Sequence, residues 1–96
     1  MSEVRLSKRA GANLRDIYLF GIEQFGRRQA EKYRLELDEC FAMLARHPRI
    51  GRTSQSIRAG VRRHEHGSHV ILYREENDGI LIVAVLHSRS IRGLKL

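Results

Sequence analysis

Apolar residues along the chain change from a helical to a strand-like spacing near its middle. In residues 8–25 they recur every three or four positions, which predicts an amphipathic helix with Leu14, Ile17, Tyr18, Gly21 and Phe25 on one stripe. A second stripe of this kind predicts a helix over residues 27–46, with Ala30, Tyr33, Leu37, Cys40, Phe41 and Leu44 on one face. Gly26 separates the two helices, and so short a break predicts an antiparallel hairpin.

The second helix ends before Pro48, because the residue before a proline is pushed out of helical geometry. Shorter apolar segments then predict strands. We expect them over residues 61–66, 69–74 and 80–87, with a further short strand at Val4-Arg5-Leu6 before Ser7, which can cap the first helix. Residues 49–59 are polar and predict a loop.

Two glycine-containing stretches predict the hairpin turns that join these strands. Gly67-Ser68 suits a type II′ turn, and Asn77-Asp78-Gly79 offers a glycine where positive φ is needed. The last strand, ILIVAVL, is apolar on both faces and is therefore predicted to be central and covered. The order β-α-α-β-β-β predicts one α+β domain over residues 1–96, a helical hairpin packed on a small, mostly antiparallel sheet.

The composition favours a cytoplasmic protein. Ninety-six residues suffice for one modest core, and the single cysteine, Cys40, excludes an intrachain disulfide. The first ten residues lack the apolar segment of a secretory signal. The longest apolar run, Ile80 to Leu86, is too short to cross a bilayer, so we expect no association with membranes.

The net charge of +7 is concentrated in one part of the chain. Residues 46–74 hold seven arginines against one glutamate, whereas residues 1–45 hold eight basic and seven acidic residues. Arginine pairs well with phosphates and carboxylates. The segment is therefore either a solvated basic face or a surface for an acidic partner, such as nucleic acid or an acidic protein.

Within this segment, HEHGSH invites comparison with a metal site. His64 and His66 lie two apart and so point to one face of a strand, and His69 follows across the turn. Zinc sites usually add cysteine or carboxylate ligands, and Cys40 belongs to a helical core stripe. We therefore expect no metal ion and no other cofactor, and interpret the histidines as lying on a half-exposed strand face.

The same region holds groups suited to cutting RNA by acid–base catalysis. Arg62, Arg63, Arg74 and Arg89 are cations for a phosphate, and His64, Glu65, His66 and His87 are candidate proton carriers. Nothing in the sequence fixes their relative positions. A nuclease and a docking surface both remain open.

Further apolar residues lie outside the two helical stripes. Leu19, Phe20 and Ile22 make the end of the first helix apolar around much of its circumference, and Leu35 and Met43 do the same on the second. These residues either widen the contact with the sheet or form a groove for an amphipathic partner segment.

Three segments together resemble the ParE toxins of the RelE/ParE toxin–antitoxin superfamily. They are AEKYRLELDECFAMLARHPRIGR, IRAGVRRHEHGSHVILYR and ILIVAVLHSR, and the similarity covers most of the chain. The resemblance implies a toxin that traps DNA gyrase with its bound DNA and is not itself a nuclease. It also implies a hetero-oligomer with a ParD-like ribbon–helix–helix antitoxin that wraps onto the toxin, and no small-molecule substrate.

On this resemblance, Arg62, Arg63, Arg74 and Arg89 form the basic surface that binds the target. Leu19, Phe20, Ile22, Leu35 and Met43 then bind the antitoxin. RelE-like relatives instead cut mRNA in the ribosome, and here that activity requires His87, with Arg62 and Arg89. No tyrosine follows Tyr73, where such enzymes often use one, which favours the ParE type. An inactive member that only binds an antitoxin is a third alternative.

Overall fold

The computed structural model describes residues 2–94 and contains two helices on a five-stranded sheet. The elements are β1 (Glu3–Leu6), α1 (Lys8–Phe25), α2 (Arg27–Arg46), β2 (Arg52–Thr53), β3 (Arg62–His66), β4 (His69–Glu76), β5 (Gly79–His87) and the 3₁₀ turn η1 (Ser88–Ser90). The strand order is β1-β5-β4-β3-β2. Only β1 and β5 run parallel, so the predicted α+β fold with a mostly antiparallel sheet is confirmed.

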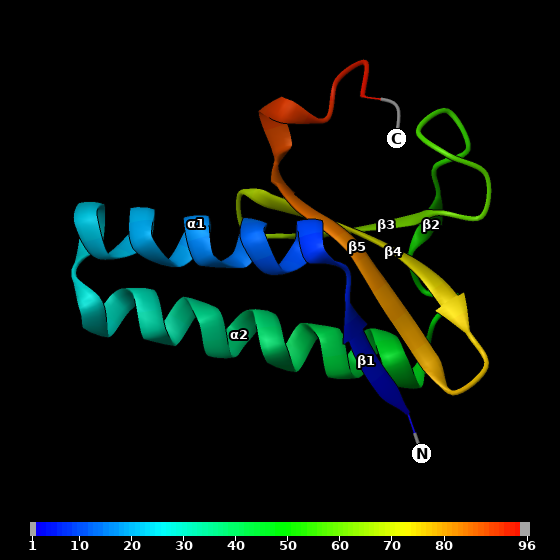
Figure 1. Cartoon of the computed structure of the whole chain (residues 1–96), viewed down its shortest axis with the longest axis horizontal. Helices are drawn as coiled ribbons and strands as arrows, with labels where there is room; N and C mark the ends of the chain where they lie inside the picture. The colour runs from blue at the N-terminus through cyan, green and yellow to red at the C-terminus, as the bar shows by residue number, and fades with distance from the viewer. Residues whose placement is uncertain (1, 95–96) are drawn as a thin grey trace.

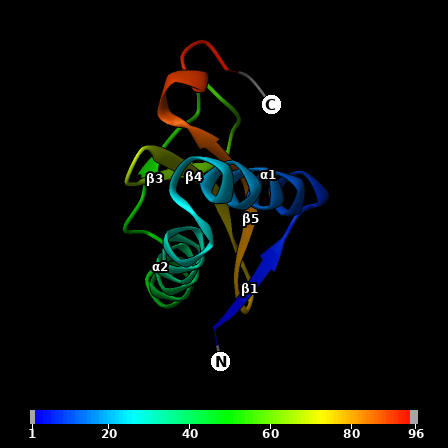
Figure 2. The same ribbon diagram turned by 90° about the vertical axis from the view of Figure 1, so that its left-hand side faces the viewer.

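The helical hairpin lies across one face of the sheet (Figures 1 and 2). Ser7 caps α1: its hydroxyl accepts a hydrogen bond from the Ala10 amide at 3.0 Å and donates one to the Val83 carbonyl oxygen at 2.7 Å. Gly26, with φ at 88°, is the only residue between the helices. The cap therefore fixes the start of α1 against β5, and the glycine reverses the chain direction.

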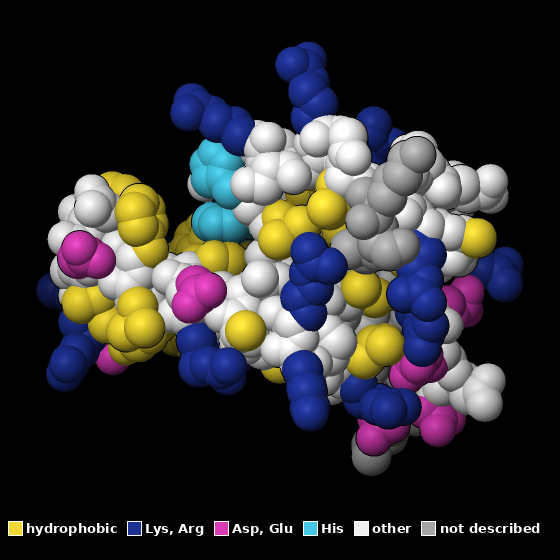
Figure 3. All heavy atoms as spheres, turned by 45° about the horizontal axis from the view of Figure 1, so that its top comes forward, with side chains coloured by type: hydrophobic (Ala, Val, Ile, Leu, Met, Phe, Trp, Pro, Cys, Tyr) yellow, Lys and Arg dark blue, Asp and Glu magenta, His cyan; other side chains and the backbone are white. Residues whose placement is uncertain are grey.

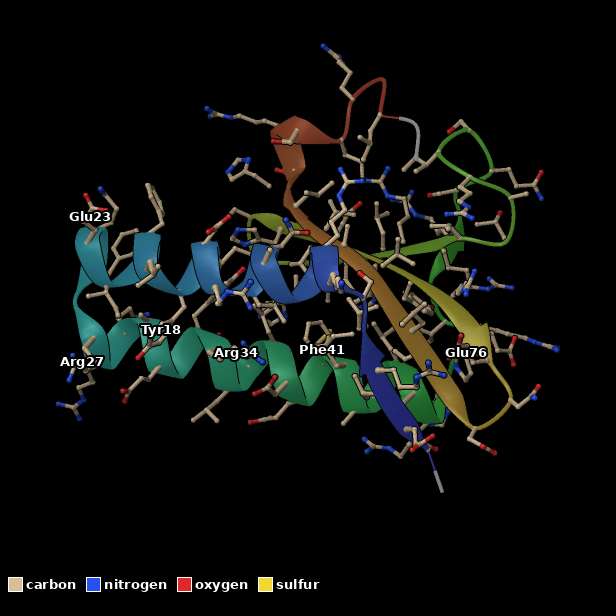
Figure 4. All side chains as sticks on the ribbon, viewed as in Figure 1. Tyr18, Glu23, Arg27, Arg34, Phe41 and Glu76 are labelled. Carbon is tan, nitrogen blue, oxygen red and sulfur yellow. The ribbon has the colours of Figure 1, made fainter. Side chains whose placement is uncertain are left out.

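The main core lies between the hairpin and the sheet. Phe41 points from α2 into this layer (Figure 4). Tyr73 of β4 is fully buried there, where its hydroxyl donates to the Pro48 carbonyl oxygen at 2.7 Å and accepts from the Gly51 amide at 2.9 Å. These bonds tie the turn after α2 to the middle strand of the sheet.

A second core covers the opposite face, and a β-bulge allows β5 to serve both. Leu72 pairs with Ala84 but Tyr73 pairs with Ile82, so Val83 is the extra residue. The bulge reverses the alternation, and Ile82 and Val85 both face the helices. The other core consists of Ile57, Val61, Val70, Leu72 and Ala84, with Ile91 and Leu94 packed against it. The prediction that the last strand is covered on both faces is confirmed.

One sequence-based prediction needs correction, and the two predicted glycine turns are observed. The predicted loop over residues 49–59 contains the short strand β2, which pairs with β3. Gly67 has φ at 56° and fits the predicted type II′ turn, and Gly79 also has the predicted positive φ, at 157°. It begins β5, and a Cβ there would overlap the Glu3 carbonyl oxygen. Glycine is needed at this position because β1 approaches it so closely.

The hairpin extends past the sheet, so its tip is not covered by strands (Figure 1). Leu14, in the first half of α1, is buried, whereas Phe20 and Phe25 near its end are 60% and 70% exposed. Within residues 2–94, neither helix is long and apolar enough to span a bilayer.

Candidate functional site

An apolar groove of about 610 Å³ opens where the hairpin overhangs the sheet. Its helical side consists mainly of apolar and aromatic residues: Ile17, Phe20, Gly21, Phe25, Ala30, Tyr33 and Leu37. Its sheet side consists of Ser68, His69, Val85, Leu86 and His87. Figure 3 shows histidine side chains facing the apolar hairpin tip across this hollow. The groove is therefore a mostly apolar surface with a polar border on one side.

The length of the hairpin relative to the sheet creates this groove. The apolar stripes of α1 and α2 continue to the hairpin tip, but the strands that cover them end earlier. Gly21 brings the helices together, since a Cβ there would lie 3.2 Å from the Ala30 Cβ. The stripes are thus packed against each other yet open on the side that faces β4 and β5. Such an apolar surface is typical of a docking site.

Tyr33 of α2 organises the polar border. Its hydroxyl oxygen is 2.6 Å from His69 Nδ1 and 3.2 Å from the His66 carbonyl oxygen. A phenol has one proton, so both contacts are hydrogen bonds when Tyr33 donates to the carbonyl and His69 Nδ1–H donates to Tyr33. In that arrangement the other ring nitrogen of His69, Nε2, carries the lone pair. A Cβ at Gly67 would lie 2.9 Å from the Tyr33 hydroxyl, so this turn also needs glycine for close packing.

Burial keeps the two central groups of this border uncharged near neutral pH. It raises the pKa of Tyr33, and the Glu36 carboxylate raises it further. Burial also lowers the pKa of His69, and the neighbouring His87 and His66 add to this effect. Charged forms are disfavoured because the groove replaces water with apolar side chains.

The residues predicted to bind an antitoxin lie in several places. Phe20 lines the groove, whereas Leu19 and Leu35 are 61% and 62% exposed but lie outside it. Ile22 is half-buried, and Met43 packs against the main core. The sequence analysis placed Ile17, Gly21 and Phe25 in the core stripe, although they line the groove. Helical periodicity identified the apolar face of each helix, but it does not indicate where along the helix the sheet stops covering that face.

The four arginines predicted to form one basic surface do not share one face of the sheet. Arg62 pairs with Tyr73 on the helical face and donates to the Gly51 carbonyl oxygen at 2.8 Å. Arg63 points to the opposite face, which by strand alternation it shares with Arg74. Arg89 lies in η1, beyond the end of β5.

Two of these four arginines, Arg63 and Arg74, already contact a carboxylate. Glu65 is 3.2 Å from Arg63 and 2.8 Å from Arg52, which the sequence analysis did not single out. Arg74 lies 3.6 Å from Glu76. Arg63 Nε is buried and has no hydrogen-bond partner among the described residues. Arg63, Arg74 and Arg52 thus give the face away from the helices an arginine-rich, partly compensated surface.

The residues named for a nuclease are also separated. His87 pairs with His69, whereas Arg62 pairs with Tyr73, four positions along β4 and therefore about 13 Å away. The Arg89 backbone amide donates to His87 Nδ1 at 3.1 Å. This local contact does not bring the Arg89 guanidinium to Arg62. His64 and His66 share the helical face, as predicted. Among residues 2–94 no three His, Cys, Asp or Glu side chains are positioned to hold a metal ion.

Comparison with known proteins gives one family. The model of that family, the ParE toxin of the type II toxin–antitoxin system parDE, matches residues 4–92. A Toxin ParE1 from Caulobacter vibrioides is 41% identical over 87 residues, which cover 91% of this chain and 90% of the relative. A Toxin ParE1 from Mycobacterium tuberculosis is 39% identical over 89 residues, or 92% and 91% of the two chains.

A solved structure supports the fold independently. It is described as the chromosomal ParDE TA system from P. aeruginosa, and superimposes with a TM-score of 0.75 over 91% of this chain and 96% of that one. The sequence identity of 23% shows a shared fold and no more. Together with the family match over residues 4–92, these likenesses place the chain in the ParE toxin family of type II toxin–antitoxin systems.

Proposed function

We propose that this toxin inhibits DNA gyrase on its bound DNA, and that a ParD-like antitoxin neutralises it by filling the groove under the hairpin. The observation that carries the proposal is the groove itself, in a chain that belongs to the ParE family. No catalytic set is required, because a toxin of this kind acts by binding.

The lining of the groove supports an amphipathic antitoxin segment as its occupant. Phe20 and Phe25 expose large aromatic surfaces on α1, and Ile17 and Tyr33 extend the apolar surface toward the sheet. A helix that places residues at i, i+3 and i+4 on one side fills such a groove. The structure with the same fold is described as a ParDE system, which is consistent with an antitoxin as the partner.

The charge distribution supports an acidic target. The excess of arginine lies in residues 46–74, and Arg63 and Arg74 project to the face away from the hairpin. Arginine suits both phosphates and carboxylates. A gyrase–DNA complex presents both, and this face is separate from the groove that we assign to the antitoxin.

Pulse-labelling after induction tests the target. We expect thymidine incorporation to stop before methionine incorporation in cells that express the toxin alone, and both to continue when a ParD-type antitoxin is co-expressed. Methionine stopping first would replace the gyrase proposal with ribosomal mRNA cleavage. Continued incorporation of both, without antitoxin, would identify an inactive member.

Purified components then test the mechanism. Gyrase supercoiling assays with increasing toxin should show accumulation of cleaved DNA. Unchanged supercoiling and no cleaved DNA would contradict the proposal even if thymidine incorporation stops in cells.

A further inference from the structure

The sheet side of the groove brings together three of the five histidines of the chain. His66, His69 and His87 come from the adjacent strands β3, β4 and β5, and their backbone positions are paired in the order His66–His69–His87. The His69 and His87 rings meet edge-on with centroids 5.8 Å apart. The Tyr33 ring packs near His66 and His69, with ring centroids 5.6 Å from His66 and 5.5 Å from His69. We call these four residues the histidine cluster.

Protons compete within the histidine cluster. Burial lowers the pKa of His69, and an imidazolium at His87 or His66 would repel a proton there as well. Glu36 Oε1 lies 3.8 Å from His66 Nε2, at the outer end of the cluster. His69 and His87 are the two histidines that line the groove, so their charge is exposed to whatever occupies it.

Other charged groups around the groove do not neutralise this pair. Asp16 and Arg34 line the helical side, and Arg34 Nε already pairs with Asp38 at 3.1 Å. Arg89 follows β5, and it contacts His87 through its uncharged backbone amide. Among residues 2–94 no ion pair joins His69 or His87 to a carboxylate. A proton taken up by His69 therefore leaves a poorly compensated charge beside an apolar surface.

We propose that the histidine cluster makes occupancy of the groove sensitive to pH, so that an apolar partner segment binds at neutral pH and is released on acidification. The identity of that partner rests on the proposed function. Apolar side chains that cover His69 and His87 remove the water that stabilises their charged forms. Binding then lowers the tendency of these rings to hold a proton, and by linkage a rising proton concentration weakens binding.

The sign and the range follow from the free protein. A histidine whose pKa falls on binding favours the complex above its free-state pKa and weakens it as the pH drops through that value. An unperturbed histidine titrates at about 6.5. Burial lowers the pKa of His69 in the free protein, so the weakening should set in below the ordinary histidine pKa of about 6.5.

Nile red, a neutral apolar dye, tests this without requiring any antitoxin. Fluorescence titrations of the whole chain should show at least roughly threefold weaker dye binding at about pH 5 than at about pH 7.5, with an upper limit near tenfold per pH unit for each histidine. Because the dye does not titrate in this range, the change belongs to the protein. Replacing Phe20 and Phe25 by serine should abolish dye binding, which would show that the dye binds in the groove.

Matched asparagine variants identify the groups responsible. The double variant His69→Asn with His87→Asn keeps a polar atom near each Nδ1 position, which contacts Tyr33 and the Arg89 amide, but does not titrate. It should bind the dye equally at both pH values. His64→Asn is the control, because His64 lies on the neighbouring strand β3 and does not line the groove. It should retain the full pH dependence of the wild type.

Several results would overturn the inference. These are dye affinity that is independent of pH or rises on acidification in the wild type, and a pH dependence that persists in the double variant. If the double variant is unfolded by circular dichroism, histidine ring-proton NMR of the wild type decides. The pKa of His69 must fall when dye is added, and an unchanged value contradicts the inference.

The antitoxin complex provides the last comparison. Absence of any complex at neutral pH would contradict the proposed function and leave the dye result standing. A complex that forms at neutral pH and is equally tight at about pH 5 would instead contradict the pH sensitivity alone.

Discussion

Tyr73 shows at the scale of one residue how a polar group specifies this fold. Its ring belongs to the main core, yet its hydroxyl bonds to the backbone on both sides of the turn that follows α2. A buried hydroxyl requires such partners, since burying it unpaired is costly. The burial also raises the pKa of Tyr73, so the phenol stays protonated and able to donate at neutral pH.

Tyr73→Phe should destabilise the protein by about 1–3 kcal/mol, because it leaves the Pro48 carbonyl and the Gly51 amide without their partner. Urea unfolding measures the change. Tyr18→Phe is the control: Tyr18 lies between the helices (Figure 4) and makes one exposed hydrogen bond, 3.3 Å long, to Glu31. Equal losses in the two variants would contradict the assigned role of Tyr73.

Gly51→Ala should cost more, about 2–4 kcal/mol, because its Cβ would overlap the Tyr73 hydroxyl and lie 2.8 Å from the Arg63 carbonyl oxygen. Gly11→Ala provides a control of opposite sign. Its Cβ would meet its nearest neighbour at 3.8 Å, and alanine in a helix should add about 0.5–1 kcal/mol. Thermal unfolding should show a lower melting temperature for Gly51→Ala and a higher one for Gly11→Ala than for the wild type.

The helices and strands show which features of the fold periodicity can predict. The bounds of α1 and α2 match the prediction, because each helix has a regular stripe and a clear stop at Gly26 or before Pro48. β2 escaped prediction since a strand of two residues shows no alternation. The bulge at Val83 escaped for the opposite reason: every residue around it is apolar, so no polar position marks the reversal.

The candidate site was predicted less well than the fold. The sequence indicated excess apolar surface on the hairpin and singled out Phe20, but it assigned Phe25 to the core and Leu35 to the binding surface. A stripe of apolar residues shows which face of a helix is apolar, whereas burial of that face depends on how far the sheet extends along the helix. This extent is set by how the helices and the sheet pack together and cannot be read from one helix.

Exposed apolar residues on α1 and α2 should therefore differ in their effect on antitoxin binding. Phe20→Ser with Phe25→Ser removes two groove residues and should weaken the complex at least about tenfold, with little change in stability because both are mostly exposed. Leu19→Ser with Leu35→Ser is the control, equally exposed but outside the groove. Isothermal titration with the antitoxin measures both. A larger loss in the leucine pair would move the binding surface to the outer side of the hairpin.

The whole molecule separates two surfaces that a single sequence segment seemed to combine. Strand alternation sends Arg62 toward the helices and Arg63 away from them, so one run of basic residues contributes both to internal structure and to the outer face. The groove and this arginine-rich face lie on opposite sides of the sheet. An antitoxin segment in the groove leaves that face uncovered unless the antitoxin continues around the molecule.

Arg52→Ala with Arg74→Ala should reduce toxicity in cells, measured as a shift of at least about tenfold in the inducer dose, because it removes two cations from the arginine-rich face away from the helices. Arg27→Ala with Arg28→Ala makes the same change of charge at the exposed hairpin tip and should leave toxicity unchanged. Equal effects in both pairs would mean that only net charge matters. The melting temperatures of the two double variants should match that of the wild type, which verifies that folding is intact.

The pairing of β1 with β5 also bears on when this toxin becomes harmful during its synthesis. β1 has a single neighbour in the sheet, and Glu3 pairs with Gly79, so the first strand of the chain joins only the last. Such a distant contact is slow to form and has no substitute earlier in the sequence. A nascent chain that is still being translated holds β1 unpaired, and the His69–His87 side of the groove does not yet exist. β1 can therefore join the sheet only after its partners in β5, residues 79–82, have been translated.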